Sequence, residues 1–128
     1  SDLTSEEWEV IYGSNHSDQQ QRYAYGHSIN NTNDGGFIIG GFADGNIGDH
    51  TNDSQYGYGI LMKVDSIGNM EWVTPMGYED DGDIGYDAKQ LSNGNYVLVG
   101  NTAHFSTPSD GAYDIIMIMV DSEGNRIF

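Results

Sequence analysis

Short apolar runs alternate with polar turns along the whole chain, and no stretch offers ten residues of helical period. Asp, Asn and Gly punctuate the runs about every 8–12 residues, a spacing that is typical of all-β proteins. The pattern predicts antiparallel strands over 8–12, 23–30, 37–42, 56–64, 70–74, 85–91, 96–101 and 113–120, with a last strand beginning at 126–128.

One of these stretches occurs twice. Residues 58–72 form an apolar run, a turn at 65–69 and a second extended segment that carries Trp72. The turn contains Gly68, which adopts a positive φ at no steric cost, so the stretch predicts a β-hairpin. The same order of residues returns at 114–128, at a spacing of 56 residues (121 − 65). The chain is therefore expected to be built from internal repeats.

The repeat extends upstream of the hairpin. Residues 33–41 align with 92–100 at a spacing of 59 residues (96 − 37), and Trp8 aligns with Trp72 and then with Phe128. The spacing changes within the loops, where insertions cost little. Each unit has four short strands, the plan of a propeller blade. We expect an N-terminal arm at 1–7 and one all-β domain at 8–128, with two propeller-like, four-stranded antiparallel blades at about 8–72 and 72–128.

These residues resemble a family of β-propeller repeats found in secreted bacterial surface proteins. Its units read roughly W-x-x-x-(Y/F)-G-G, then S-D-G-G-Y-I-I-A-G, then V-K-(L/V)-D-x-x-G-N-x-x-W. The match is carried by 8–13, 33–41 and 62–72; the second unit is looser at 93–95 and ends in Phe128. The resemblance implies blades that serve as scaffolds or binding modules, in an extracellular or cell-surface location.

The ends of the predicted sheets differ. Closed propellers need ~4–8 blades, and this sequence has two. A strand precedes the first blade, whereas the last strand is short, so one sheet edge is left open and invites pairing with another chain. Three arrangements fit: the N-terminal strand closes the second sheet within the chain as a two-sheet sandwich, several chains close a ring, or strands are donated along a filament. A partial propeller cut from a longer chain is also consistent. The expected interface residues are Trp8, Val10, Tyr12, Ile127 and Phe128.

The charge of the chain narrows the possible partners. With 4 basic and 20 acidic residues the net charge is −16. Nucleic acids and anionic lipids need a basic surface, so neither is an expected partner. No apolar run approaches the ~20 residues that span a bilayer, and we expect no membrane insertion. The chain has no cysteine, which excludes thiol catalysis and cysteine-ligated zinc.

Two acidic loops are candidates for Ca²⁺, a cation that binds 6–8 oxygen ligands in loops of Asp, Asn and Gly. One holds Asp80, Asp81 and Asp83, and the other holds Asp44 and Asp49. Neither fits the EF-hand pattern, and the alternative is a pair of solvated acidic turns.

No catalytic motif appears in the sequence, and we expect no enzymatic activity. Sequons place candidate glycosylation at Asn15, Asn30 and Asn52. The sequence thus predicts a non-catalytic extracellular module that self-associates as a surface or fibre subunit. The alternative is a calcium-assisted module for carbohydrate binding or adhesion, in which exposed tyrosines stack on glycans.

Overall fold

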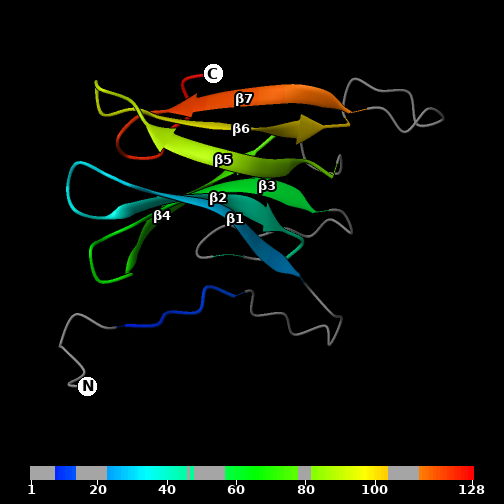
Figure 1. Cartoon of the computed structure of the whole chain (residues 1–128). Helices are drawn as coiled ribbons and strands as arrows, with labels where there is room; N and C mark the ends of the chain where they lie inside the picture. The colour runs from blue at the N-terminus through cyan, green and yellow to red at the C-terminus, as the bar shows by residue number, and fades with distance from the viewer. Residues whose placement is uncertain (1–7, 14–22, 46, 48–56, 78–81, 104–112) are drawn as a thin grey trace.

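The computed structural model describes residues 8–13, 23–45, 47, 57–77, 82–103 and 113–128. This part of the chain is all-β and forms two antiparallel sheets (Figure 1). Sheet 1 has the order β1-β2-β3-β4, and sheet 2 has the order β5-β6-β7. The strands are β1 (Ala24–Asn31), β2 (Phe37–Ala43), β3 (Tyr58–Val64), β4 (Met70–Met76), β5 (Ile84–Gln90), β6 (Tyr96–Thr102) and β7 (Asp114–Val120).

The all-β prediction is confirmed, and seven of the predicted strands are present within a few residues of their expected bounds. Two end segments differ. Residues 8–13 are not a strand, because their side chains pack on sheet 1 while their backbone has no ladder with another described segment. Residues 126–128 contribute one bridge, between Arg126 and Val120, so sheet 2 has three strands instead of four. The predicted arm at 1–7 lies outside the described residues.

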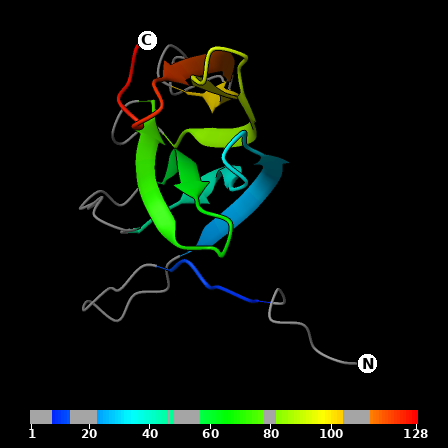
Figure 2. The ribbon, with the colours of Figure 1, turned by 90° about the vertical axis from the view of Figure 1, so that its left-hand side faces the viewer.

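The two sheets stack face to face, with the N-terminal segment on one side of the stack and the C terminus on the other (Figures 1 and 2). Residues 8–13 lie beyond sheet 1, on the side away from sheet 2. The prediction that the N-terminal strand closes sheet 2 within the same chain is therefore wrong. No described segment forms a helix able to cross a membrane.

The strand registers repeat between the sheets. The β1–β2 pair and the β5–β6 pair share one register at a spacing of 59 residues. Each carries a bulge at the same place, at His27 in β1 and at Tyr86 in β5. The β2–β3 and β6–β7 pairs correspond at a spacing of 56 for the later strand. Sheet 2 is thus a structural repeat of sheet 1 up to the start of its fourth strand.

The second hairpin turn is also repeated in detail. In sheet 1 the Asp65 carboxylate accepts hydrogen bonds from the backbone of Ile67 and Asn69. In sheet 2 the Asp121 carboxylate accepts the same two bonds from Glu123 and Asn125. Glycine follows at the positive-φ position in both turns, with φ of 88° and 85°. These shared bonds fix the same hairpin geometry in both sheets.

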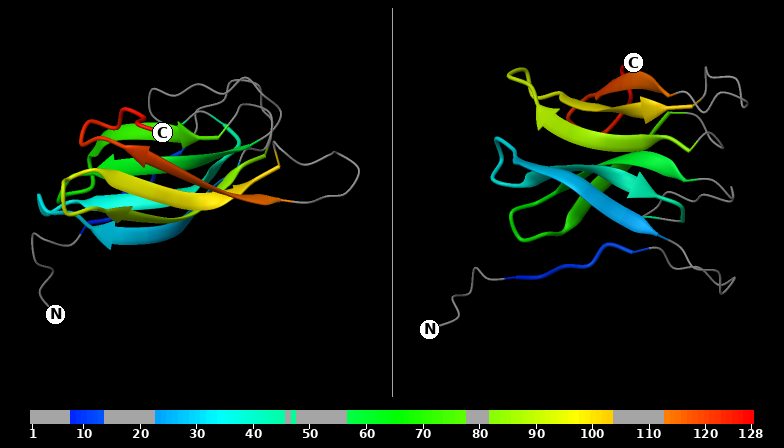
Figure 3. Two further views of the ribbon diagram at one scale, coloured as in Figure 1. Left: turned by 90° about the horizontal axis from the view of Figure 1, so that it is seen from above. Right: turned by 45° about the vertical axis from the view of Figure 1, so that its right-hand side comes forward.

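One hydrophobic cluster lies between the sheets, where β5 packs against β1, β2 and β3 (Figure 3). A second cluster, on the other face of sheet 1, consists of Ala43, Ile47, Tyr58 and Ile60. Leu61 and Ile38 of sheet 1 meet Leu98 and Ile118 of sheet 2, and all four are fully buried. Large aliphatic side chains of this kind contribute roughly 1.5–3 kcal/mol each when buried.

Polar bonds link β1 and β5, which are edge strands of the two sheets. The Asn30 amide donates to the carbonyl oxygen of Ala88 at 2.6 Å, and the Ala88 N–H donates to Ser28 Oγ at 3.0 Å. The Asn33 N–H donates to Gln90 Oε1 at 2.7 Å. These bonds fix the offset of one sheet over the other.

Candidate interaction surfaces

The outer edge of β7 is the open edge of sheet 2. Met119 bonds there with the last residues: the Ile127 N–H donates to Met119 O at 2.7 Å, and the Met119 N–H donates to Phe128 O at 2.7 Å. Of the described residues, only 126–128 pair with this edge. Backbone groups along 114–118 therefore face outward with no strand partner in the part of the chain that the structure describes.

Sheet 2 also exposes an apolar face. Side chains alternate between the two faces of a strand, and Leu98 and Ile118 point toward sheet 1. Their neighbours point the other way, and Ile115 is 85% exposed and Met117 is 52% exposed. We call this set the open face of sheet 2: Val97, Val99, Ile115, Met117 and Met119. It joins the open edge of β7 directly, since three of its members belong to that strand.

The N-terminal segment, residues 8–13, contacts sheet 1 in the way that β4 contacts sheet 2. Trp8 meets Phe37 edge-to-face at 6.2 Å, and its ring covers Gly68 in the turn after β3. The Tyr12 hydroxyl donates to the carbonyl oxygen of Gly68.

The same contacts occur one unit later, between the sheets. Trp72 of β4 meets Tyr96 edge-to-face at 5.5 Å, and its ring covers Gly124. The Thr74 hydroxyl donates to the carbonyl oxygen of Gly124 at 2.5 Å. Residues 8–13 therefore relate to sheet 1 as β4 relates to sheet 2.

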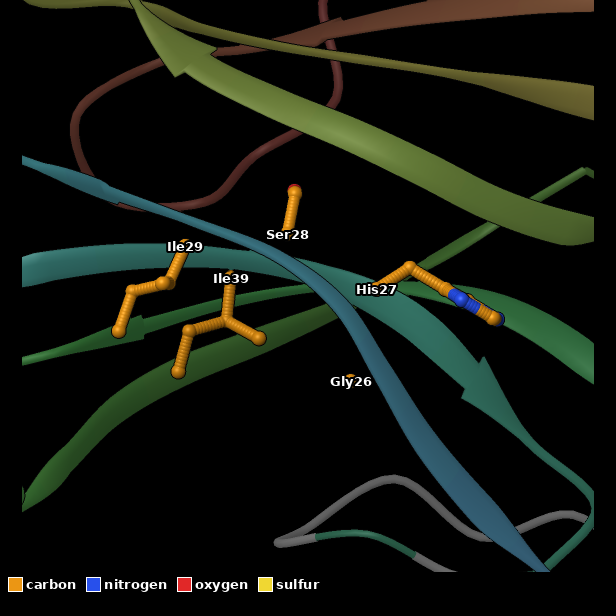
Figure 4. Close-up of a pocket in the computed structure, with 5 residues that line it drawn as sticks. All are labelled: Gly26, His27, Ser28, Ile29 and Ile39. Atoms are coloured by element: carbon orange, nitrogen blue, oxygen red, sulfur yellow. The ribbon is translucent and has the colours of Figure 1, made fainter.

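A shallow hollow of ≈ 340 Å³ lies along β1 of sheet 1. Ile29 and Ile39 line it, and their side chains point to the same side, away from sheet 2 (Figure 4). Ser28 points the opposite way, toward β5. Ile29 is 62% exposed, so the β1 side of this face offers apolar surface to a partner, whereas Ile60 and Met62 on the same face are buried. We call Ile29 and Ile39 the receiving face of sheet 1.

The structure divides the five predicted interface residues between the two ends of the stack. Trp8, Val10 and Tyr12 gather over Gly68 beside sheet 1, whereas Ile127 and Phe128 lie at the edge of β7. All but the half-buried Tyr12 are exposed.

Sequence reasoning missed the open face itself. The signal was present: residues 115–120 are continuously apolar, a pattern of a strand buried on both faces, yet β7 is an edge strand.

The predicted calcium ligands are only partly described. Asp49, Asp80 and Asp81 lie outside the described residues. Asp44 accepts a hydrogen bond from the Tyr23 backbone, and Asp83 is fully buried beside Gly77. Within the described ranges, no three acidic or histidine side chains gather as a metal site. The calcium site stays a prediction.

The buried amine of Lys63 and the carboxylates of Asp34 and Glu71 form a charged cluster. Lys63 is 1% exposed, and its Nζ lies 3.0 Å from carboxylate oxygens of both Asp34 and Glu71. Burial would lower the pKa of Lys63, but the hydrogen bonds and charges of the two carboxylates outweigh it and raise that pKa. Hydrogen bonds from Thr32 and Lys63 lower the pKa of Asp34 to about 2. The cluster ties the β1–β2 turn to β3 and β4.

One predicted glycosylation residue is described. The Asn30 amide nitrogen, where a glycan would attach, donates to Ala88 O, so attachment in the folded protein would break a bond between the sheets. Asn15 and Asn52 lie outside the described residues.

No protein-family model matches this chain, and no curated protein is significantly similar to it.

Proposed function

We propose that this chain is a non-catalytic extracellular interaction module that self-associates by strand complementation, as a subunit of a surface structure or fibre. The observation that carries the proposal is the open edge of β7, where 114–118 present an unpaired backbone ladder among the described residues. Such an edge binds an extended segment through main-chain hydrogen bonds. The acidic charge of −16 and the resemblance to secreted surface proteins support an extracellular location.

The N-terminal segment is the donor that fits this edge. In sheet 1, residues 73–76 of β4 pair with 59–62 of β3. The repeat aligns 9–12 with 73–76, and 115–118 with 59–62. A second copy would therefore place its residues 9–12 opposite 115–118. Phe128 stands where Trp72 stands in sheet 1, so the donated strand continues where the chain's own pairing stops.

Substitution of Ile115 by proline tests the proposal. Its N–H faces the open edge, because Ile115 alternates in step with Met119, which bonds outward to Phe128. Proline at such a site removes an edge donor and leaves the ladder with β6 intact. We expect the parent chain to form oligomers in sedimentation velocity and Ile115→Pro to remain monomeric, with Ile115→Val as the matched control.

Removal of residues 1–12 provides an independent arm of this experiment. The truncated chain retains both sheets and lacks the donor, so it should be monomeric where the intact chain assembles. A parent chain that stays monomeric up to millimolar concentration would refute the proposed function. Assembly that survives truncation would eliminate strand donation by this segment.

A further inference from the structure

The internal repeat relates the exposed face of sheet 2 to a buried face of sheet 1. The registers align Val97 with Ile38 and Met117 with Leu61. Ile38 and Leu61 are both fully buried against sheet 2, whereas Met117 is half exposed. The open face of sheet 2 thus occupies, within its own sheet, the position of a face that packs on a following sheet.

The converse holds at the other end of the stack. Ala88 and Leu98 of sheet 2 are buried against sheet 1. The same registers align them with Ile29 and Ile39, the receiving face of sheet 1. The chain therefore carries both halves of its own sheet-to-sheet interface, one at each end of the stack.

From this relation we infer that a second copy of the chain stacks face to face on the first, with the open face of sheet 2 against the receiving face of sheet 1. This inference rests on the proposed self-association and adds the surface and the polarity of the contact. Because two different faces meet, the contact is heterologous and adds copies head to tail.

Side-chain sizes indicate how the contact between copies differs from the contact within a chain. Gly40 packs closely on Leu98 and Ala88, since a Cβ on it would lie 2.8 Å from Leu98 Cδ1. The repeat places Val99 at the position of Gly40, so the copies must stack at a wider spacing than the two sheets of one chain. The hollow beside Ile29 and Ile39 gives room for these larger side chains.

A polar contact between copies can also form at this wider spacing, because a longer side chain stands at the position of Asn30. Asn30 donates to the carbonyl oxygen of Ala88 within the chain. The registers align Asn30 with Lys89 and Ala88 with Ile29. The longer Lys89 side chain of one copy can thus reach the Ile29 carbonyl of the next across the larger gap.

Stacking and strand donation are compatible with one arrangement of the two copies. Residues 8–13 lie on the outer side of sheet 1, next to the receiving face (Figures 1 and 2). A sheet 2 that stacks on this face brings its β7 edge toward the segment of the other copy. The donor can then pair without leaving its contacts with Phe37 and Gly68.

Two single variants of the full chain test the polarity of the contact. Met117→Lys puts a charge on the open face of sheet 2, and Ile29→Lys puts one on the receiving face of sheet 1. Both side chains are more than half exposed, so the fold should tolerate each change. We expect each variant to self-associate at least tenfold more weakly than the parent. Their equimolar mixture should form a 1:1 heterodimer that grows no further, because one intact interface remains.

The control is Ile67→Lys, in the turn after β3, where the side chain is 61% exposed and lies on neither face. It should assemble like the parent. Ile115→Lys serves as a second variant of the open face if Met117→Lys melts at a lower temperature. Face variants that assemble like the parent, or a mixture that stays monomeric, would overturn the inference. A parent that assembles while Ile115→Pro does not would still support the proposed function.

Discussion

The contact between Trp72 and the turn of sheet 2 gives a quantitative prediction for Gly124→Ala. Gly124 has a φ of 85°, and a Cβ on it would lie 2.6–2.9 Å from three carbons of the Trp72 indole. The substitution has two effects, strain of the left-handed backbone and collision with the ring. Gly94→Ala isolates the first effect, because Gly94 has a φ of 90° and a Cβ there would meet nothing within 4 Å.

The destabilisation expected for Gly124→Ala depends on the contacts of the Trp72 ring that the new Cβ disturbs. A left-handed alanine costs roughly 1 kcal/mol, and this is the whole effect expected at Gly94. At Gly124 the ring must also move, which costs roughly 1–3 kcal/mol of overpacking. The bond from Thr74 Oγ1 to Gly124 O adds about 1 kcal/mol if it is lost. We expect Gly124→Ala to destabilise the fold by about 2–4 kcal/mol more than Gly94→Ala.

Thermal denaturation followed by far-ultraviolet circular dichroism measures this difference without depending on tryptophan fluorescence. At about 4 °C per kcal/mol for a domain of this size, Tm should be roughly 8–16 °C lower for Gly124→Ala than for Gly94→Ala. Tm values within about 2 °C of each other would show that Trp72 does not clamp the turn of sheet 2.

The N-terminal segment provides a second matched pair. A Cβ on Gly68 would lie 2.6 Å from the Trp8 ring, whereas one on Gly35 would meet nothing within 4 Å. Residues 8–13 have no ladder with a described strand and can shift, so the excess cost at Gly68 should be smaller than at Gly124. An equal or greater excess would mean that the segment is held as firmly as β4.

Further predictions concern charge. Lys63→Met should change the free energy of unfolding by less than about 1 kcal/mol, because the carboxylates that pair with Lys63 stay hydrated. Replacing both Asp34 and Glu71 by Ala instead leaves the buried Lys63 ammonium without an ion-pair partner, and should lower the free energy of unfolding by about 3 kcal/mol. Urea denaturation measures both changes. The folded pKa of Asp34 lies below the ordinary 3.8, so its stabilisation is complete above about pH 4 and is lost toward pH 2. Because Asp34 is exposed to solvent, its stabilisation of the fold is limited to about 1 kcal/mol. The difference in Tm between the parent and Asp34→Asn should therefore disappear as the pH falls from about 4 toward 2. Because each copy carries a charge of −16, added NaCl should strengthen self-association in sedimentation, and unchanged or weaker association would argue against an apolar contact. If the acidic loops bind Ca²⁺, Tm should be higher in Ca²⁺ than in EDTA for the parent and equal in both for Asp81→Ala.

The fold could be predicted because its signals are local. The turn residues Asp65 and Gly68 recur as Asp121 and Gly124 and make the same bonds, so two matching hairpins followed from the sequence. The stacking of the sheets depends on contacts far apart in sequence. The bond from Asn30 to Ala88, for example, joins residues 58 apart, and no local pattern indicates it.

The sequence predicts the terminal residues of the candidate interface and does not indicate the open face of sheet 2. Trp8 and Phe128 stood out because they align with Trp72. Ile115 and Met117 belong to an apolar run, which sequence reasoning assigns to a core. The exposure of Ile115 (85%) and Met117 (52%) shows that one side of this run has no cover among the described residues.

Approximate magnitudes indicate that the face and the edge act together. Complete burial of the exposed parts of Ile115, Met117 and Val99 would yield roughly 3–5 kcal/mol, and that of Ile29 adds about 1–2 kcal/mol. Association of two molecules costs at least about 4 kcal/mol and often more, so face stacking alone is near break-even.

Strand pairing changes this balance. Four or five main-chain hydrogen bonds along the β7 edge contribute about 1 kcal/mol each, which is also too little alone. Their sum with the apolar face exceeds the lower estimates of the cost of association. It follows that Ile115→Pro and Met117→Lys, which each remove one contribution, should both prevent assembly at micromolar concentration. A chain that still assembles strongly with either change must gain its affinity from a surface other than sheet 2.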